Sequence, residues 1–266
     1  LERLLHPNIV RFHGLQESGG QIFMLMDFVE RITLRKAVML ADGVPFTAPE
    51  ILEIMQPICS ALQYAHQMEI VHGGLKPVNI MIENSGWVQV AEFGISRHTL
   101  GAGTYSLADK ESRAYMSPEQ IRGEDPSPQT DIYALGLVLF ELLTGGERPF
   151  TSVMTVKPGS SKDKKQWDQS SQKPISPRQF NPRITSNMEM VVLKCLARNP
   201  AERYKSTLEL LDALQNALRD YAQPVPPPAE KEPVIEQPDP GAVKNPDIKQ
   251  DPGPKKKVLV YLVGSL

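Results

Sequence analysis

The sequence predicts an α+β fold, in which a mostly helical unit carries a small antiparallel sheet. Two short apolar runs, 80–82 and 88–91, flank the polar residues 83–86, and this is the pattern of a β-hairpin. Capping sequences precede several stripes of apolar residues at helical spacing. The segment 131–143 is apolar nearly all round, so it should be a helix that lies within the core.

The composition suits a globular protein with a sizeable core. The chain has 266 residues, a formal net charge of −2 and 41% hydrophobic residues. A balance so close to neutral gives no indication of a nucleic-acid partner.

The cysteines and one helical histidine are expected to be structural. Cys59 and Cys195 lie far apart within apolar helical patterns, so we expect reduced core residues, as in a cytosolic protein. His66 has no second ligand at metal-binding spacing, which favours a structural role over a role as a metal ligand.

The first part of the chain predicts a short helix and two strands. Residues 1–5 have the pattern of a piece of amphipathic helix, and 9–13 and 22–26 have the pattern of strands. The polar residues 16–20 should join these two strands. Met26 is expected to be a core residue of the second strand.

Capping sequences mark the starts of three later helices, at 47–50, 186–189 and 206–209. The apolar stripe of the first helix consists of Ile51, Met55, Ile58, Leu62 and Ala65. The second helix should run through Val191, Val192 and Cys195 to Ala197. The stripe of the third helix is predicted to be Leu208, Leu211, Leu214, Leu218 and Tyr221.

Three segments have no strong periodicity. Residues 94–119 are rich in Gly, Ser and Thr and should form a mobile loop. Residues 151–183 are polar and should form a long surface connection, in which Trp167 either anchors the loop or faces a partner. Residues 222–254 are rich in proline and poor in large apolar side chains, so an extended disordered linker is expected there.

The residues around the predicted hairpin match the pattern of a known family. Residues 70–82 read I-V-H-G-G-L-K-P-V-N-I-M-I, and V-A-E-F-G follows at 90–94. This resembles the protein-kinase catalytic loop H-R-D-L-K-P-x-N followed by D-F-G. The chain departs from the pattern where Gly73-Gly74 replaces Arg-Asp and where Glu92 replaces the metal-binding Asp.

Other stretches resemble the same family in the expected order. They are L-x-x-L-x-H-P-N-I-V at the start, Y-M-S-P-E at 115–119, D-x-x-x-x-G from Asp131, and N-P-x-x-R-Y at 199–204. In the family, an Asp at the position of Asp131 braces the backbone of the catalytic loop. The resemblance also implies a buried ion pair between Glu119 and Arg203, which would contribute to stability.

The resemblance implies a protein-kinase-like fold with a mostly helical large lobe and a remnant of the antiparallel small-lobe sheet. Residues 1–29 would be the remnant of the small lobe and the hinge, and 30–221 the large lobe. The linker at 222–254 would follow, and then, at 255–266, a basic flank and the start of a possible truncated transmembrane segment.

The resemblance also implies a site for ATP and Mg²⁺. Lys76 matches the lysine that steadies the transferred phosphoryl group, within a degenerate loop that contains His72, Gly73 and Gly74. Asn79 and Glu92 match the two metal ligands. Met26 matches the gatekeeper, and Asp27 and Val29 belong to the hinge whose backbone would meet adenine.

The end of the chain allows two interpretations. Three lysines at 255–257 precede the apolar residues 258–266, which are either the start of a truncated transmembrane segment or a short tail. A span needs roughly 20 apolar residues. Basic residues before a span place the preceding domain on the cytoplasmic side, and bacterial receptor-type Ser/Thr kinases show the same order of domain, linker and span.

Three hypotheses of function follow. Gly74 and Glu92 together predict a pseudokinase, a signalling module that binds a protein partner and has weak or absent phosphate transfer and weak or lost binding of ATP and Mg²⁺. The surviving Lys76 and Asn79 allow an active Ser/Thr kinase with a protein substrate, because Lys76-Pro77 resembles the Ser/Thr pattern. The missing small-lobe motifs suggest a gene remnant.

Overall fold

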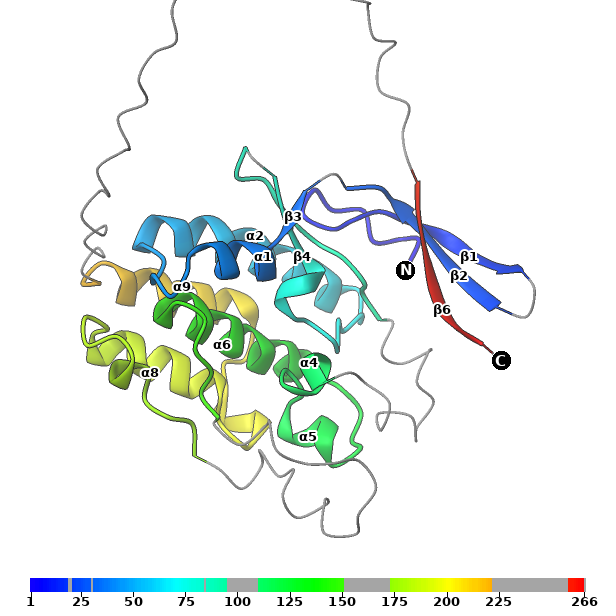
Figure 1. The fold of residues 1–266 in the computed structure, drawn as a ribbon. Helices are drawn as coiled ribbons and strands as arrows, with labels where there is room; N and C mark the ends of the chain where they lie inside the picture. Colours follow the sequence, from blue (N-terminus) through cyan, green and yellow to red (C-terminus); the bar gives the residue numbers. More distant parts are fainter. Residues whose placement is uncertain are drawn as a thin grey trace, which may run out of the picture.

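A computed structural model describes residues 1–18, 21–29, 31–83, 85–94, 110–150, 173–221 and 258–265. A helical part and two three-stranded sheets make up these residues (Figure 1). Most of the predicted loop at 94–119, Trp167 with most of its connection, and the predicted linker lie outside the described residues.

The first sheet has the strand order β1-β2-β6. Strands β1 (Phe12–Ser18) and β2 (Gln21–Asp27) pair antiparallel. Strand β6 (Val258–Ser265), drawn in red in Figure 1, pairs antiparallel with the other edge of β2. The C-terminal apolar run therefore completes a sheet that begins near the N-terminus.

The sequence left two interpretations of this run open, the start of a truncated transmembrane segment or a short tail, and the structure shows a strand instead of a helical span. Val258–Ser265 form a strand, and the edge of β2 offers this β-prone run backbone groups with which to pair. Across the ranges that the structure describes, no helix is both long enough and apolar enough to cross a membrane.

The second sheet contains the predicted hairpin. Strands β4 (Ile80–Ile82) and β5 (Val88–Val90) pair antiparallel, with Ile80 opposite Val90, which confirms the prediction. The two-residue strand β3 (Ile32–Thr33) pairs with the other edge of β4.

The N-terminal predictions were wrong in detail. Residues 1–5 form a turn rather than a helix, with the Leu4 amide donating to the Leu1 carbonyl over 2.9 Å. The first strand begins only at Phe12 and extends through the polar residues expected to form a turn. The reason is that the preceding residues pair elsewhere: the Val10 amide donates to the Val90 carbonyl, at the edge of β5.

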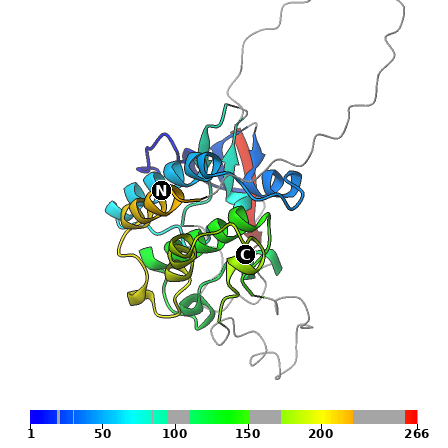
Figure 2. The ribbon, with the colours of Figure 1, turned by 90° about the vertical axis from the view of Figure 1, so that its left-hand side faces the viewer.

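In the described ranges the longer helices are stacked in layers, and three short 3₁₀ turns accompany them (Figures 1 and 2). The helices are α1 (Leu34–Leu40), α2 (Ala48–Gln67), α4 (Lys110–Arg113), α5 (Pro118–Ile121), α6 (Pro128–Thr144), α8 (Ser186–Cys195) and α9 (Thr207–Leu218). The 3₁₀ turns are η1 (Pro77–Asn79), η3 (Pro177–Gln179) and η4 (Pro200–Glu202). Helix α2 packs against α9, and α6 packs against α8.

The sequence predicted the first long helix and the central one correctly. A capping box of Thr47 and Glu50 begins α2, and all five residues of its predicted stripe are fully buried. Helix α6 is buried on every side from Thr130 to Thr144, as its apolar composition requires. Its burial places Asp131 in the core, next to the loop residues His72 and Gly73.

The two C-terminal helices required small corrections. Thr185, not Ser186, caps α8, and the helix ends at Cys195. In α9, Leu208 is 48% exposed, whereas Leu210 is fully buried. The core-facing stripe therefore begins at Leu210, and the remaining predicted positions of α9 lie in the core as expected.

Helices α6 and α8 approach each other closely at Gly136. A Cβ atom on Gly136 would lie only 2.5 Å from the Cβ atom of Cys195. We expect Gly136→Ala to lower the free energy of unfolding by about 1–3 kcal/mol through overpacking, although alanine favours a helix by about 1 kcal/mol. Thermal denaturation checks this, and a Tm at or above that of the wild type would contradict the close packing.

Candidate active site

The candidate site lies where the chain enters and leaves the β4–β5 hairpin. Two backbone hydrogen bonds join the entering and leaving segments: the Ala91 amide donates to the Asn79 carbonyl (2.8 Å), and the Gly94 amide donates to the His72 carbonyl (3.3 Å). The predicted loop residues and Glu92 are therefore neighbours in space, as the resemblance implied.

His72 is a buried structural residue of this site. Its Nε2–H donates to the Ala91 carbonyl (3.0 Å), and its Nδ1 accepts from the Gly74 amide (3.2 Å). Its ring also packs on that of Phe93, with the ring centroids 4.7 Å apart. Burial lowers the pKa of His72, although the charge of Asp131 opposes this, and the hydrogen bonds assign the neutral ring with its proton on Nε2.

Asp131 holds the backbone of the loop at His72 and Gly73 in place, as the resemblance implied. Its Oδ2 accepts from the His72 amide (3.0 Å), and its Oδ1 accepts from the Gly73 amide (2.8 Å). His66 Nε2 lies 2.7 Å from Asp131 Oδ2, so His66 has the structural role that the sequence analysis favoured. One buried carboxylate thus accepts hydrogen bonds from two backbone amides of the loop and also contacts the side chain of His66, on α2.

The two glycines of the loop have different conformations. Gly73 has φ +68°, a left-handed conformation that glycine adopts at little cost, whereas Gly74 does not have a positive φ. The carbonyl of Gly74 accepts from the Asn79 side chain (3.2 Å), and that of Gly73 accepts from Gln120 Nε2 (2.6 Å). The backbone is therefore well held, but position 74 offers no side chain for chemistry.

Lys76, Asn79 and Glu92 converge in the structure. Burial raises the pKa of Glu92, whereas the charge of Lys76 and a hydrogen bond with the Asn79 side chain lower it. Lys76 Nζ donates to Ser112 Oγ over 2.8 Å. Sequence reasoning missed Ser112, because it lies in a segment without periodicity and its contact with Lys76 arises only from the fold.

The residues present fit a divalent cation in part. Mg²⁺ is usually held by one or two carboxylates together with substrate phosphates, and the Asn79 amide and the Glu92 carboxylate would be the ligands that the chain supplies. In the described part of the chain, no group of three His, Cys, Asp or Glu side chains could hold a metal ion. The chain alone therefore provides only a small donor set.

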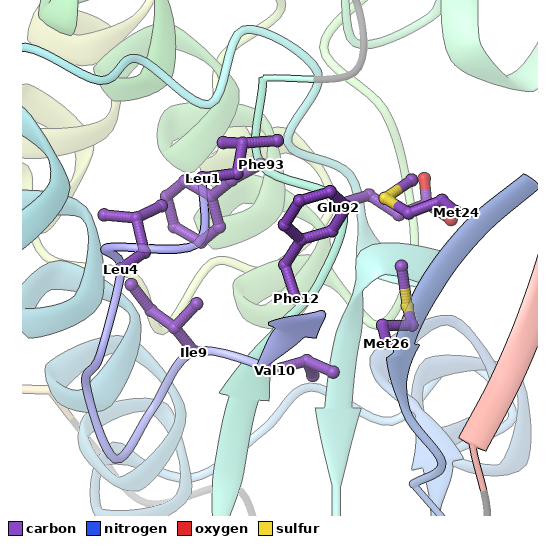
Figure 3. Close-up of a pocket in the computed structure, with 9 residues that line it drawn as sticks. All are labelled: Leu1, Leu4, Ile9, Val10, Phe12, Met24, Met26, Glu92 and Phe93. Carbon is purple, nitrogen blue, oxygen red and sulfur yellow. The ribbon is translucent and has the colours of Figure 1, made fainter. Parts of the chain in front are cut away.

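A small pocket of about 20 Å³ lies beside Glu92 (Figure 3). Its walls are otherwise apolar, and Met26, which is buried as expected of a core residue, lines it. Its lining residues are Leu1, Leu4, Ile9, Val10, Phe12, Met24, Met26, Glu92 and Phe93. The predicted hinge residues Asp27 and Val29 are not among them.

The predicted hinge continues directly from β2. The Asp27 amide donates to the Arg11 carbonyl (2.9 Å), and the Asp27 side chain lies 2.7 Å from His13 Nε2. The carbonyl of Val29 accepts from the Arg31 amide over 3.1 Å. The predicted contact of this backbone with adenine stays a prediction.

The ion pair between Glu119 and Arg203 is confirmed. Arg203 Nη1 and Nη2 donate to the two carboxylate oxygens of Glu119 over 2.6 and 2.8 Å, and both residues are buried. Thr130 Oγ1 donates to the same carboxylate (3.0 Å). The pair joins the start of α5 to the turn η4, across 84 residues of sequence.

Comparison with known proteins identifies the family. Residues 1–215 match the protein kinase domain, so the chain belongs to the protein kinase domain family. The fold class and the family that the motifs implied are confirmed. Members of this family transfer the γ-phosphoryl group of ATP with the help of Mg²⁺.

The relatives that are most similar by sequence include bacterial Ser/Thr kinases. The chain is 36% identical over 214 residues to serine/threonine-protein kinase PknB of Mycobacterium tuberculosis, covering 78% of this chain and 33% of that protein. It is 36% identical over 211 residues to serine/threonine-protein kinase PrkC of Bacillus subtilis, covering 77% and 30%. The chain thus spans about a third of the length of the curated relatives it matches.

A solved structure shows the same fold. The crystal structure of the Mycobacterium tuberculosis PknI kinase domain matches with a TM-score of 0.63 and 25% sequence identity, covering 81% of this chain and 74% of that chain. The chain is therefore a protein kinase domain similar to those of bacterial Ser/Thr kinases.

Proposed function

We propose that this chain is a pseudokinase-type signalling module, with weak or absent phosphate transfer, that acts by binding a protein partner. Gly74 carries the proposal. It lies in the loop that holds Lys76, where the family has the Asp that accepts the proton of the acceptor hydroxyl. Glycine can neither orient that hydroxyl nor accept its proton, and positioned base catalysis contributes roughly 10²–10⁴-fold.

Glu92 supports the same proposal, because its length affects the expected binding of Mg²⁺. It keeps the charge of the family's Asp but is one methylene longer, and Mg²⁺ requires nearly ideal octahedral geometry. Weakened or lost binding of ATP and Mg²⁺ follows.

A second candidate function is an active Ser/Thr kinase that transfers the γ-phosphoryl group to protein hydroxyls. Lys76, Asn79 and Glu92 still converge, and Lys76 is held at 2.8 Å by Ser112. In this case Lys76 would steady the phosphoryl group, and Asn79 and Glu92 would hold the cation. The bound cation would neutralise developing charge on the phosphates.

The placement of the module in the cell is part of the proposal. Two sequence features support a cytoplasmic domain tethered through its C-terminus: the proline-rich residues 222–254, as a disordered linker, and the lysines at 255–257. The apolar run that follows does not support a tether, because Val258–Ser265 form the strand β6. Within such a protein, 1–29 and 30–221 would be the small-lobe remnant with its hinge and the large lobe.

A phosphate-transfer assay separates the two candidate functions. Because the chain spans about a third of the length of the relatives it matches, the assay uses the full-length protein with Mg²⁺ and ATP. The pseudokinase predicts turnover at least about 10²-fold below the ordinary kinase range of roughly 1–100 per second. Turnover within that range would favour the active kinase.

A further inference from the structure

One edge of β2 is covered by a segment from the far end of the chain. In the described sheet, β6 pairs with this edge, and β1 pairs with the other (Figure 1). The strand β2 reads Q-I-F-M-L-M-D, and an apolar edge of this kind, when bare, pairs readily with another extended chain. The edge is therefore a site that accepts a strand, and the structure shows it occupied.

Contacts that do not involve β6 hold β2 in place. On its other side it pairs antiparallel with β1 along most of its length. Met24 and Met26 are each only 4% exposed. They belong to a small buried cluster whose other members are Val10 and Ala91. The edge should therefore keep its form when β6 leaves, so that little ordering of β2 opposes the binding of another strand.

The strand β6, in contrast, is attached mainly through this edge. Residues 258–262 pair one for one with the residues from Asp27 back to Phe23. Within the described residues, β2 is the element with which β6 makes extensive contact. An element with few other contacts opens at a lower free energy than the core does. We therefore expect β6 to leave the edge without unfolding of the helical part.

The chain that connects β6 to the helical part is long. About 36 residues, 222–257, separate Tyr221 from Val258, and fully extended they would span up to roughly 120 Å. The linker predicted there would present β6 to the edge at an effective concentration on the order of millimolar. The strand β6 is thus a tethered competitor for any other strand that approaches β2.

The sequence of β6 shows which chemistry the edge accepts. The run V-L-V-Y-L-V-G-S contains neither a charged residue nor a proline, and valine, leucine and tyrosine fill most of it. Proline would remove a ladder hydrogen bond, and β-branched and aromatic residues favour strands. A segment of another protein with the same properties could form the same ladder.

We propose that the edge of β2 is the docking site for a protein partner that binds as an extended apolar strand, and that β6 is the reversible intramolecular occupant of this site. Main-chain hydrogen bonds would supply the affinity, as in other cases of strand addition. One strand at a time can pair with the edge, so β6 and the partner exclude each other. The inference rests on the proposed partner-binding function and names the class of partner.

A fluorescent peptide with the sequence of residues 255–266 is the probe, titrated into the whole chain and followed by fluorescence anisotropy. Val260→Pro with Tyr261→Pro should disable β6, because proline donates no ladder hydrogen bond and the amides of adjacent residues face opposite edges of a strand. The peptide should bind this variant at least about tenfold more tightly than it binds the wild type. A peptide that carries the same two prolines should bind neither protein.

A disulfide that locks β6 keeps the test valid if the proline variant does not fold. Leu25 lies opposite Val260 in the register, and opposite residues of antiparallel strands lie within the Cα distances that a disulfide bridges. Oxidation of Leu25→Cys with Val260→Cys should close a disulfide within one chain and abolish binding of the peptide, and reduction should restore it. The matched control, Leu25→Cys with Tyr261→Cys, should stay open, because neighbouring residues of a strand point to opposite faces.

Several results would overturn the proposal. They are equal affinity of the peptide for the wild type and the folded proline variant, no binding to either, and a disulfide that does not close or that leaves binding unchanged. Cross-links between two chains instead of within one would also overturn it, because β6 would then occupy the edge of a second copy. None of these measurements involves phosphate transfer, so a failure here is distinguishable from a failure of the pseudokinase proposal.

Discussion

Arg203→Ala is expected to lower the free energy of unfolding by about 3–5 kcal/mol, because it leaves the buried Glu119 carboxylate without its counter-charge. Arg203 donates to both oxygens of Glu119 and also to the Gln129 carbonyl (2.8 Å). For a domain of this size the Tm should fall by roughly 6–20 °C. Thermal denaturation of the purified protein measures it.

An exposed pair of the same chemistry provides the control. Arg122 lies 2.5 Å from Glu124, and both side chains are about half exposed. Arg122→Ala should change stability by no more than about 1 kcal/mol. If Arg203→Ala and Arg122→Ala shifted the Tm equally, the structural importance of the buried pair would be refuted.

The same pair should make stability depend on pH. Burial by itself would raise the pKa of Glu119, but the hydrogen bonds and charge of Arg203 outweigh it and lower this pKa below its ordinary value. The unfolded state therefore binds a proton more readily than the folded state. The contribution of the pair is present above the ordinary glutamate pKa of about 4.3 and is lost as the pH falls through the lowered value. Glu119→Gln should reduce this dependence in acid denaturation.

Asp131→Ala should have an effect of similar size. It removes the acceptor of two buried backbone amides, His72 and Gly73, and the partner of His66. Each unsatisfied buried donor costs about 1–3 kcal/mol, so a loss of about 2–6 kcal/mol is expected. Hydrogen exchange of the His72 and Gly73 amides should accelerate more than that of the β4–β5 ladder.

Two further variants show whether the acceptor itself is responsible. Asp131→Asn keeps one acceptor oxygen and should lie between the wild type and Asp131→Ala. Asp212→Ala, on the exposed face of α9, should leave the loop amides unchanged. Unchanged protection of the His72 amide in Asp131→Ala would rule out the bracing role of Asp131.

The sequence predicted best those features in which a local pattern and the tertiary fold agree. The stripe of α2, the hairpin and the burial of Asp131 depend on period and composition, which a single sequence contains. The pair of Glu119 and Arg203 came from ordered motifs rather than from periodicity, and the structure confirmed it.

The errors have tertiary causes. Residues near Val10 have a strand pattern, but they pair with β5 and not with β2. The sequence pattern could not show this, because β5 lies about 80 residues later in the chain. Leu208 fits the helical stripe by its spacing, yet it is 48% exposed, and Leu210 is the residue that is buried where α9 packs against α2. Ser112 has no local signal at all, since its contact with Lys76 joins residues that are 36 positions apart in the sequence.

Phosphate transfer by the variant Gly74→Asp with Glu92→Asp tests the pseudokinase account most directly. The backbone permits both changes, since Gly74 does not have a positive φ and Asp tolerates the left-handed conformation at position 92 better than most residues. We predict that the full-length wild type transfers radiolabelled phosphate at close to background. The double variant should be faster by about 10²–10⁴-fold, and a further Lys76→Ala should abolish this gain. A wild-type turnover of roughly 1–100 per second, or a double variant no faster than the wild type, would contradict the assignment of the defect to Gly74 and Glu92.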